Sequence, residues 1–189
     1  MRIGLLLGSF DPVHNWHLEM AQKALEANLV DQVFFVPAKQ NPWKEKSTDY
    51  AKRCWMLLSE VKRIPNCKVS AIEDKLPPPY YSYKTLQALK EKYHNDDLYL
   101  IVGADTATSI KDWKEGDWIL NNVQLITVSR PGNEDPGIVD IPLQVDISST
   151  QIRNLVKENK AIDHLVPKSI NGLINILNLY KDEKLSSNN

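Results

Sequence analysis

Short apolar runs alternate with longer amphipathic segments along most of this chain of 189 residues, and this alternation constrains the fold more than any other feature of the sequence. The short runs have the length and composition of β-strands, whereas the longer segments carry apolar residues at helical spacing. Strands that alternate with helices are typical of βαβ units, in which crossover helices join parallel strands. The sequence therefore predicts an α/β fold built on a mainly parallel sheet.

The apolar runs and the segments between them give a set of expected elements. The expected strands are Arg2–Leu7, Gln32–Val36, Cys67–Ala71, Leu98–Val102, Val123–Val128 and Leu143–Val145. The expected helices are about Asn15–Asn28, Asp49–Ile64, Tyr83–Tyr93 and Asp112–Leu120. In the second of these helices Ala51, Trp55 and Leu58 recur at helical spacing, which predicts that Trp55 packs in the core.

The chain is expected to end in helices. Ser148 to Thr150 can cap a helix that continues to about Lys157, and Pro167 suits the first turn of another helix. Neither a linker nor an internal repeat is recognisable, so a single domain over residues 1–189 is expected. Its parts would be an α/β core at 1–146, a small helical C-terminal subregion at 147–180 and a polar tail at 181–189.

The composition argues against several classes of protein. Lys and Arg number 23 against 24 Asp and Glu, a balance that disfavours a nucleic-acid-binding module. Every apolar run is far shorter than the roughly 18 residues of a membrane span, and the first run is too short for an export signal. Cys54 and Cys67 have neither metal-ligand spacing nor a disulfide framework around them. We therefore expect a cytoplasmic enzyme with no nucleic-acid or membrane partner.

The segment from Gly8 to His17 carries the most informative pattern. A strand ends at Gly8, a turn follows, and His14 and His17 lie one helical turn apart at the start of an amphipathic helix. Backbone amides beside a glycine can approach a ligand closely, and the free N–H groups of a helix N-terminus attract phosphate. Two imidazoles on one face add donors for developing negative charge. For one histidine alone an ordinary surface or core residue is the usual alternative, and a zinc site would need a further ligand.

A second cluster lies at the predicted start of a C-terminal helix. Ser148 and Ser149 precede Arg153 there, so the hydroxyls and helix amides could bind one phosphate while the guanidinium clamps another. The alternative interpretation is plain N-capping beside a solvated arginine.

Other candidate residues lie between these two clusters. Asp105, just after Gly103 at the end of a predicted strand, could accept hydrogen bonds from a ribose or adenine, or cap the next helix. Trp113 could stack on a flat ring or pack in the core, and Lys44 could contact a phosphate or remain a solvated lysine. Ligands bind beyond the carboxyl ends of the strands in open α/β sheets, so the segments that follow strands are expected to meet at one edge.

With these motifs the sequence resembles the nicotinate/nicotinamide mononucleotide adenylyltransferases, a family of the nucleotidyltransferase superfamily that joins ATP to a pyridine mononucleotide. The resemblance extends over nearly the whole chain and implies a Rossmann-like parallel sheet flanked by helices, with a small helical C-terminal subregion. The motifs that carry it are Gly8-Ser-Phe-Asp-Pro-Val-His-Asn-Trp-His17, Gly103-Ala-Asp105, Trp113, Ser129-Arg-Pro-Gly132, Ile147-Ser-Ser-Thr-Gln-Ile-Arg153, Leu165-Val-Pro167 and Asn178-Leu-Tyr180.

The resemblance also implies roles for residues at matching positions. The residues implied to bind ATP are Gly8, Ser9, Phe10, Lys44, Gly103, Asp105, Ser148 and Ser149, with His14, His17 and Arg153 as catalytic residues. The residues implied to bind the mononucleotide are Ser82, Thr85, Trp113 and Arg130, with Trp113 stacked on the pyridine ring. Mg²⁺ would accompany ATP, held largely by phosphates and water rather than by protein ligands.

The expected reaction is direct, in-line transfer of the adenylyl group to the phosphate of the mononucleotide, with release of pyrophosphate and no covalent intermediate. The attacking phosphate is already largely ionised near neutral pH, so it needs no protein base. Catalysis would then rest on positioning and on neutralising charge.

Departures from the family pattern leave parts of this expectation open. Trp16 stands where bacterial members carry Gly, Lys84 replaces an Asp, and Trp43 replaces a His. The choice between nicotinate and nicotinamide mononucleotide stays open, and so does the oligomeric state, with a homo-oligomer among the expected assemblies. The alternative functions are another nucleotidyltransferase of this fold, acting on phosphopantetheine or glycerol phosphate, and a non-catalytic nucleotide sensor.

Overall fold

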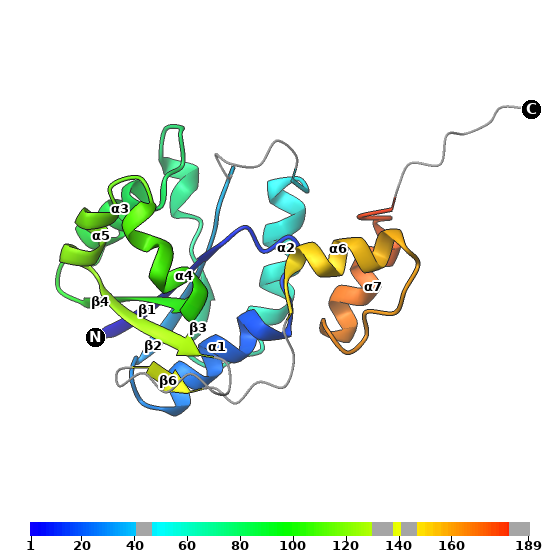
Figure 1. The fold of residues 1–189 in the computed structure, drawn as a ribbon, viewed down its shortest axis with the longest axis horizontal. Coiled ribbons are helices and arrows are strands. Elements are labelled where there is room, and N and C mark those ends of the chain that lie inside the picture. Colours follow the sequence, from blue (N-terminus) through cyan, green and yellow to red (C-terminus); the bar gives the residue numbers. More distant parts are fainter. Residues whose placement is uncertain (41–46, 130–137, 141–146, 182–189) are drawn as a thin grey trace, which may run out of the picture.

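The computed structural model describes residues 1–40, 47–129, 138–140 and 147–181, and it contains one six-stranded, all-parallel sheet (Figure 1). The strand order is β3-β2-β1-β4-β5-β6, so the order reverses between β1 and β4. The strands are β1 (Arg2–Gly8), β2 (Gln32–Pro37), β3 (Cys67–Val69), β4 (Asp97–Gly103), β5 (Gln124–Ser129) and β6 (Ile138–Asp140). This topology is that of a doubly wound α/β fold, as the sequence predicts, and the reversal creates a crevice at the carboxyl ends of β1 and β4.

The central strands are buried on both faces, which explains why they read as continuous apolar runs. Along β1, Leu5 faces one hydrophobic core and Leu6 the other, and Phe34 and Phe35 alternate in the same way along β2. Leu5 lies between Phe34 and Leu100 in the parallel register, so large side chains form rows across each face. The sheet therefore separates two hydrophobic cores and contributes side chains to both.

Helices cover both faces of the sheet. Figure 1 shows α3, α4 and α5 on one side and α1 and α2 on the other, with α6 and α7 beyond α2. The helices are α1 (Asn15–Glu26), α2 (Tyr50–Val61), α3 (Ser82–Lys92), α4 (Ala104–Ser109), α5 (Gly116–Asn122), α6 (Ser149–Lys157) and α7 (Lys168–Ile176). Two short 3₁₀ turns, η1 (Ile72–Lys75) and η2 (Ile110–Asp112), complete the described elements.

The structure corrects the expected position of Trp55. Trp55 is 51% exposed and Leu58 is 49% exposed. The apolar stripe that carries these two residues therefore faces solvent rather than the core. The buried face of α2 instead carries Met56, Leu57 and Val61. Two apolar stripes compete on this helix, and its periodicity alone does not show which of them packs against the sheet.

Several expected boundaries also differ from those observed. The strand β6 was not predicted, whereas the predicted strand Leu143–Val145 lies outside the described residues. The short helix α4 was missed, and the helix predicted over Asp112–Leu120 begins only at Gly116. Glu115 has φ 56°, a left-handed conformation that separates η2 from α5, so Trp113 lies in the connection between them.

Gly116 makes the approach of α5 to η2 possible, which gives a testable prediction. A Cβ on Gly116 would lie 2.2 Å from the Ile110 carbonyl oxygen and 2.7 Å from that of Lys111. Gly116→Ala is therefore expected to lower the free energy of unfolding by about 2–3 kcal/mol. The matched control is Gly172→Ala on α7, where nothing lies within 4 Å of the added carbon. That change should raise the free energy of unfolding by about 0.5–1 kcal/mol.

Urea unfolding followed by circular dichroism measures both variants. A Gly116→Ala protein as stable as the wild type would contradict the proposed close approach between α5 and η2.

Candidate functional site

The turn between β1 and α1 wraps around the ring of Phe10. This side chain is only 2% exposed, and its backbone has φ 47°, an unusual conformation for a residue with a side chain. The ring lies 3.2 Å from where a Cβ of Gly8 would stand, so glycine allows the turn to pass close to it. The same ring makes an edge contact with His17, at a centroid distance of 4.9 Å. Phe10 is therefore a buried support for the turn and for His17.

His14 and His17 stack on each other at the N-terminus of α1. Their ring centroids are 3.7 Å apart and the rings are inclined by 25°. The backbone N–H of His14 donates a hydrogen bond to Nδ1 of His17 at 3.3 Å. Because Nδ1 accepts this bond, a neutral His17 carries its proton on Nε2 and can donate it to a ligand.

Both imidazoles are held in their neutral form. Burial lowers the pKa of His14 to about 3, and its side chain is 2% exposed. Burial is also the main cause that lowers the pKa of His17 well below its usual value, and repulsion from His14 adds to it. At neutral pH these residues can therefore supply hydrogen bonds, but not positive charge.

The N-terminal part of α6 contacts the same turn. Ser149 Oγ donates to the carbonyl oxygen of Pro12 at 3.0 Å, and Arg153 Nη1 donates to that of Asp11 at 2.8 Å. These carbonyls lie only two and three residues before His14 in the sequence. The structure therefore brings Arg153 and the two histidines to one place, although about 140 residues separate them along the chain.

The polar side chains at this end of α6 have intramolecular partners. Ser148 is the N-cap, and its hydroxyl accepts a hydrogen bond from the backbone N–H of Gln151 at 3.1 Å. Thr150 Oγ1 accepts one from Arg153 Nη2, also at 3.1 Å. Ser148 therefore fits the capping interpretation, whereas Arg153 is anchored rather than solvated. The phosphate contacts inferred for both residues remain predictions.

Two adjoining cavities open at the carboxyl ends of the strands. The first has a volume of about 420 Å³ and the second about 220 Å³. The first cavity is lined by Leu7, Gly8, Ser9, Val36, Ala38, Glu73, Tyr80, Tyr81, Ser82, Asp112, Trp113 and Lys114. The second is lined by Leu6, Leu7, Trp16, His17, Met20, Leu100, Ile101, Val102, Gly103, Ala104, Asp105, Thr106, Trp113 and Val128.

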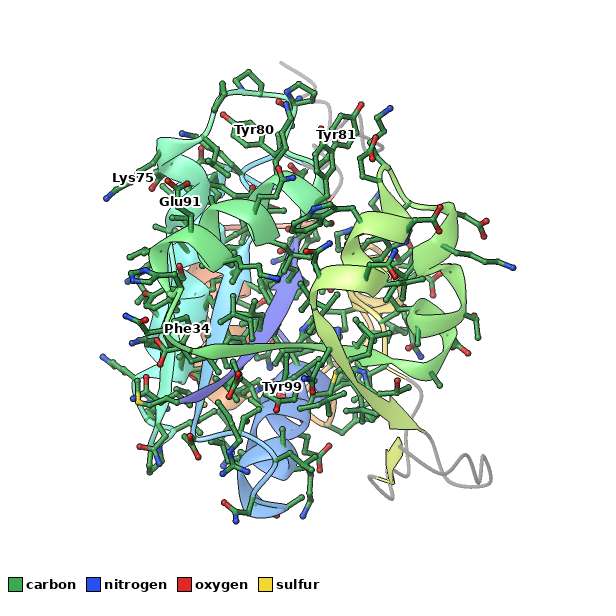
Figure 2. The ribbon with its side chains drawn as sticks, turned by 90° about the vertical axis from the view of Figure 1, so that its left-hand side faces the viewer. Phe34, Lys75, Tyr80, Tyr81, Glu91 and Tyr99 are labelled. Atoms are coloured by element: carbon green, nitrogen blue, oxygen red, sulfur yellow. The ribbon has the colours of Figure 1, made fainter. Side chains whose placement is uncertain are left out.

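The half-buried side chain of Trp113 lines both cavities and so lies where they adjoin. Figure 2 shows Tyr80 and Tyr81 beyond the carboxyl end of β1, whereas Phe34 and Tyr99 lie lower along the sheet. The open ends of both cavities therefore coincide with the crevice that the strand order creates.

Only some of the sequence-predicted residues line the two cavities. Gly8 and Ser9, expected to bind ATP, line the first cavity. Among the predicted residues that line neither cavity are Phe10, His14, Ser148, Ser149 and Arg153. Ser82 lines the first, and His17, Gly103 and Asp105 line the second. A Cβ on Gly103 would have no atom within 4 Å, so this glycine leaves space beside the strand end.

Thr85 is fully buried and lies behind the first cavity rather than on its surface. Its hydroxyl donates to Glu73 Oε1 at 2.7 Å, and the backbone N–H of Lys39 donates to Glu73 Oε2, also at 2.7 Å. Burial raises the pKa of Glu73, although both hydrogen bonds oppose this shift. Sequence analysis missed Glu73 because the inward direction of its side chain depends on contacts with the segment after β2 and with α3.

Arg53 is a second buried group that sequence analysis missed. Its guanidinium is 1% exposed and donates to three backbone carbonyls, those of Ser9 at 2.6 Å, Thr48 at 2.8 Å and Lys39 at 3.1 Å. Arg53 thus ties the turn after β1 to the segments that follow β2 and precede α2.

The remaining predicted residues are placed elsewhere or not described. Lys44 and Arg130 lie outside the described residues, and so does Trp43. Lys84 does not line the first cavity, but Lys114 does. Sequence analysis did not single out Lys114, although it is the immediate neighbour of Trp113.

Two properties of the described residues bear on other kinds of function. Among them, no group of three or more His, Cys, Asp or Glu side chains could hold a metal ion. No described helix is long and apolar enough to cross a membrane.

Comparison with known proteins gives consistent matches. The cytidylyltransferase-like family model matches residues 5–155. The nicotinate-nucleotide adenylyltransferase of Bacillus subtilis is 35% identical, over 95% of this chain and 98% of that protein. A probable nicotinate-nucleotide adenylyltransferase of Thermus thermophilus is 37% identical, over 96% of this chain and the whole of that protein.

A solved structure shows a similar fold at lower sequence identity. Plasmodium falciparum nicotinic acid mononucleotide adenylyltransferase, complexed with NaAD, superposes with a TM-score of 0.82. The identity is 20%, over 95% of this chain and 97% of that chain.

The buried neutral histidines predict that acid destabilises the fold. Between the pKa of folded His14, about 3, and its ordinary value of 6.5, only the unfolded chain binds the proton. Stability is therefore expected to fall as the pH decreases from 7.5 to 5, with His14 contributing about 2 kcal/mol of that loss. Urea unfolding at both pH values measures this change.

The comparison variants are His14→Asn and, as a control, His94→Asn at an exposed position. His14→Asn should weaken the pH dependence but leave the part that comes from His17, whereas His94→Asn should retain the wild-type dependence. An unchanged pH dependence in His14→Asn would contradict the neutral, buried state of His14.

Proposed function

This chain belongs to the nicotinate-nucleotide adenylyltransferase family, and we propose that it joins ATP to nicotinate mononucleotide, giving the dinucleotide and pyrophosphate in NAD biosynthesis. One observation of the structure supports this function above the others. The turn that leads into the histidine pair is joined to the start of α6 by two hydrogen bonds. The same segment lines the two adjoining cavities that share Trp113, with Gly8 and Ser9 in the first and His17 in the second. Such an arrangement suits two nucleotides whose phosphates must come together.

ATP fits the side of the site formed by the second cavity. Gly103 leaves space at the end of β4, and Asp105 lies in the first turn of α4. We place the adenosine there, with the triphosphate extending past His17 toward the N-terminus of α6. Free N–H groups at a helix N-terminus and the guanidinium of Arg153 are suitable partners for phosphate oxygens.

The mononucleotide fits the first cavity, which is the larger one. Trp113 offers a flat surface for a pyridine ring, and Ser82 offers a hydroxyl and the backbone N–H of the first turn of α3. The ammonium group of Lys114 belongs to the same lining. A cation and a helix N-terminus favour a carboxylate over a neutral amide, which supports nicotinate rather than nicotinamide as the base. A flat ring substrate also fits Trp113 better than phosphopantetheine or glycerol phosphate would.

The reaction needs positioning more than proton transfer. The phosphate of the mononucleotide is the nucleophile and attacks the α-phosphorus of ATP as pyrophosphate leaves. The neutral His17 would donate its Nε2 proton in a hydrogen bond to a phosphate oxygen, and Arg153 would supply positive charge. Mg²⁺ would enter as part of the ATP complex, because an ion held by phosphates and water needs no ligand cluster from the chain.

The function is tested by pyrophosphate release from purified protein with MgATP. Release is expected with nicotinate mononucleotide, with a kcat/KM about tenfold or more above that for nicotinamide mononucleotide. His17→Ala should lower kcat by about 10²–10³-fold, because the lost donor acts mainly on the transition state. The KM for the mononucleotide should change by less than about threefold, since His17 lies in the other cavity.

The control variant is His94→Ala, whose exposed side chain lies outside both cavities. Binding of ATP without pyrophosphate release would identify a nucleotide sensor instead. Near-wild-type turnover of His17→Ala would contradict the role given to this imidazole.

A further inference from the structure

Asp11 is a buried residue that the proposed reaction leaves without a role. It is 4% exposed, and each of its carboxylate oxygens accepts a hydrogen bond. The hydroxyl of Tyr180 donates to Oδ1 at 2.7 Å, and the backbone N–H of Thr48 donates to Oδ2 at 3.1 Å. The backbone oxygen of Asp11 accepts the bond from Arg153 described above. Asp11 thus joins the turn after β1 to three other segments of the chain.

Tyr180 reaches this cluster from the far end of the chain, 169 residues from Asp11. Burial is the main cause that raises the pKa of its phenol far above the usual value, so the hydroxyl stays protonated and acts as the donor. The neighbouring Leu179 is 8% exposed and belongs to the larger core, so the backbone that carries Tyr180 is anchored by packing. The phenol is therefore a fixed donor rather than a surface side chain.

The position of Arg153 depends on this cluster. Its Nη1 donates to the Asp11 carbonyl, so the place of the guanidinium follows the orientation of that peptide group. The Asp11 side chain is held at both oxygens, by Tyr180 on one side and by Thr48 on the other. Loss of either donor would leave a buried carboxylate oxygen unsatisfied and would favour a rearrangement of the turn.

We propose that Tyr180 is a positioning residue for adenylyl transfer, which acts through the Asp11 carboxylate to hold Arg153 beside the triphosphate. This inference rests on the proposed function. Tyr180 contacts neither cavity, so its effect on the reaction passes through the turn and the guanidinium. The C-terminal segment thereby becomes a part of the ATP site, although it supplies no group that touches the substrate.

A merely structural role for Tyr180 would have a different signature. An anchor for the end of the chain would change the midpoint of thermal unfolding, while the folded fraction of the protein would bind and turn over ATP normally. A positioning role changes the kinetics toward ATP at temperatures where the variant is fully folded. The two roles are therefore separated by measuring both properties on the same preparation.

The test compares Tyr180→Phe with Tyr99→Phe, which removes a hydroxyl near the opposite end of the sheet (Figure 2). Tyr180→Phe is expected to lower kcat/KM for ATP by about 5–20-fold, with the KM for nicotinate mononucleotide within about twofold of wild type. Tyr99→Phe should leave both quantities within about twofold of wild type. Equal kinetics for the two variants, with only the melting midpoint of Tyr180→Phe lowered, would overturn the proposal.

A double-mutant cycle with Asp11→Asn tests the path of the effect. If Tyr180 acts through the carboxylate, Tyr180→Phe should change kcat/KM for ATP by less than about twofold in the Asp11→Asn background. Full multiplication of the two effects would show that Tyr180 acts by another route and would overturn the proposal.

Binding of adenosine α,β-methylene triphosphate, measured by calorimetry, gives a readout that does not depend on turnover. Tyr180→Phe should raise its dissociation constant by about fivefold over that of Tyr99→Phe, and equal constants would overturn the proposal. Wild-type protein that binds this analogue but releases no pyrophosphate would contradict the proposed function, while the binding comparison would still decide the role of Tyr180.

Discussion

The hydrogen bonds that join α6 to the carbonyls of Asp11 and Pro12 are the interaction on which the rest of the site depends. They connect a turn at the start of the chain to a helix near its end. They bring Arg153 to the turn that leads into the histidine pair, an approach that the sheet alone does not provide because α6 follows its last described strand. In the proposed function this junction provides the phosphate-binding edge that the two substrates share.

The histidine pair offers fixed hydrogen-bond donors rather than positive charge. The stacked imidazoles, His14 buried and His17 at the surface of the second cavity, are neutral. The bond from the His14 backbone selects the tautomer of His17 that can donate from Nε2. Neutral donors fixed in advance suit a reaction in which the nucleophile already carries its charge. The ring of Phe10 packs against His17, and its own backbone adopts a left-handed conformation. Backbone strain of this kind is typical of functional sites.

Short sequence patterns predicted those features of the fold and site that residues close together in the chain determine. The alternation of strands and helices, the glycines that end β1 and β4, and the spacing of the histidines all follow from short segments. The exposed face at Trp55 could not be predicted in this way, because α2 has two apolar stripes and the packing decides between them. Glu73 gave no signal, and Tyr180 was part of the Asn178-Leu-Tyr180 motif but received no role, since the roles of both arise from hydrogen bonds to distant segments.

A crystal structure with MgATP analogue and nicotinate mononucleotide bound would test the central claim most directly. We expect the triphosphate to lie between His17 Nε2 and the N-terminus of α6, with the guanidinium of Arg153 on a phosphate oxygen. The adenine should occupy the cavity at Gly103, and the pyridine ring should stack on Trp113. A triphosphate bound away from α6, with Arg153 in contact with no part of it, would contradict the claim that the two ends of the chain form one phosphate site.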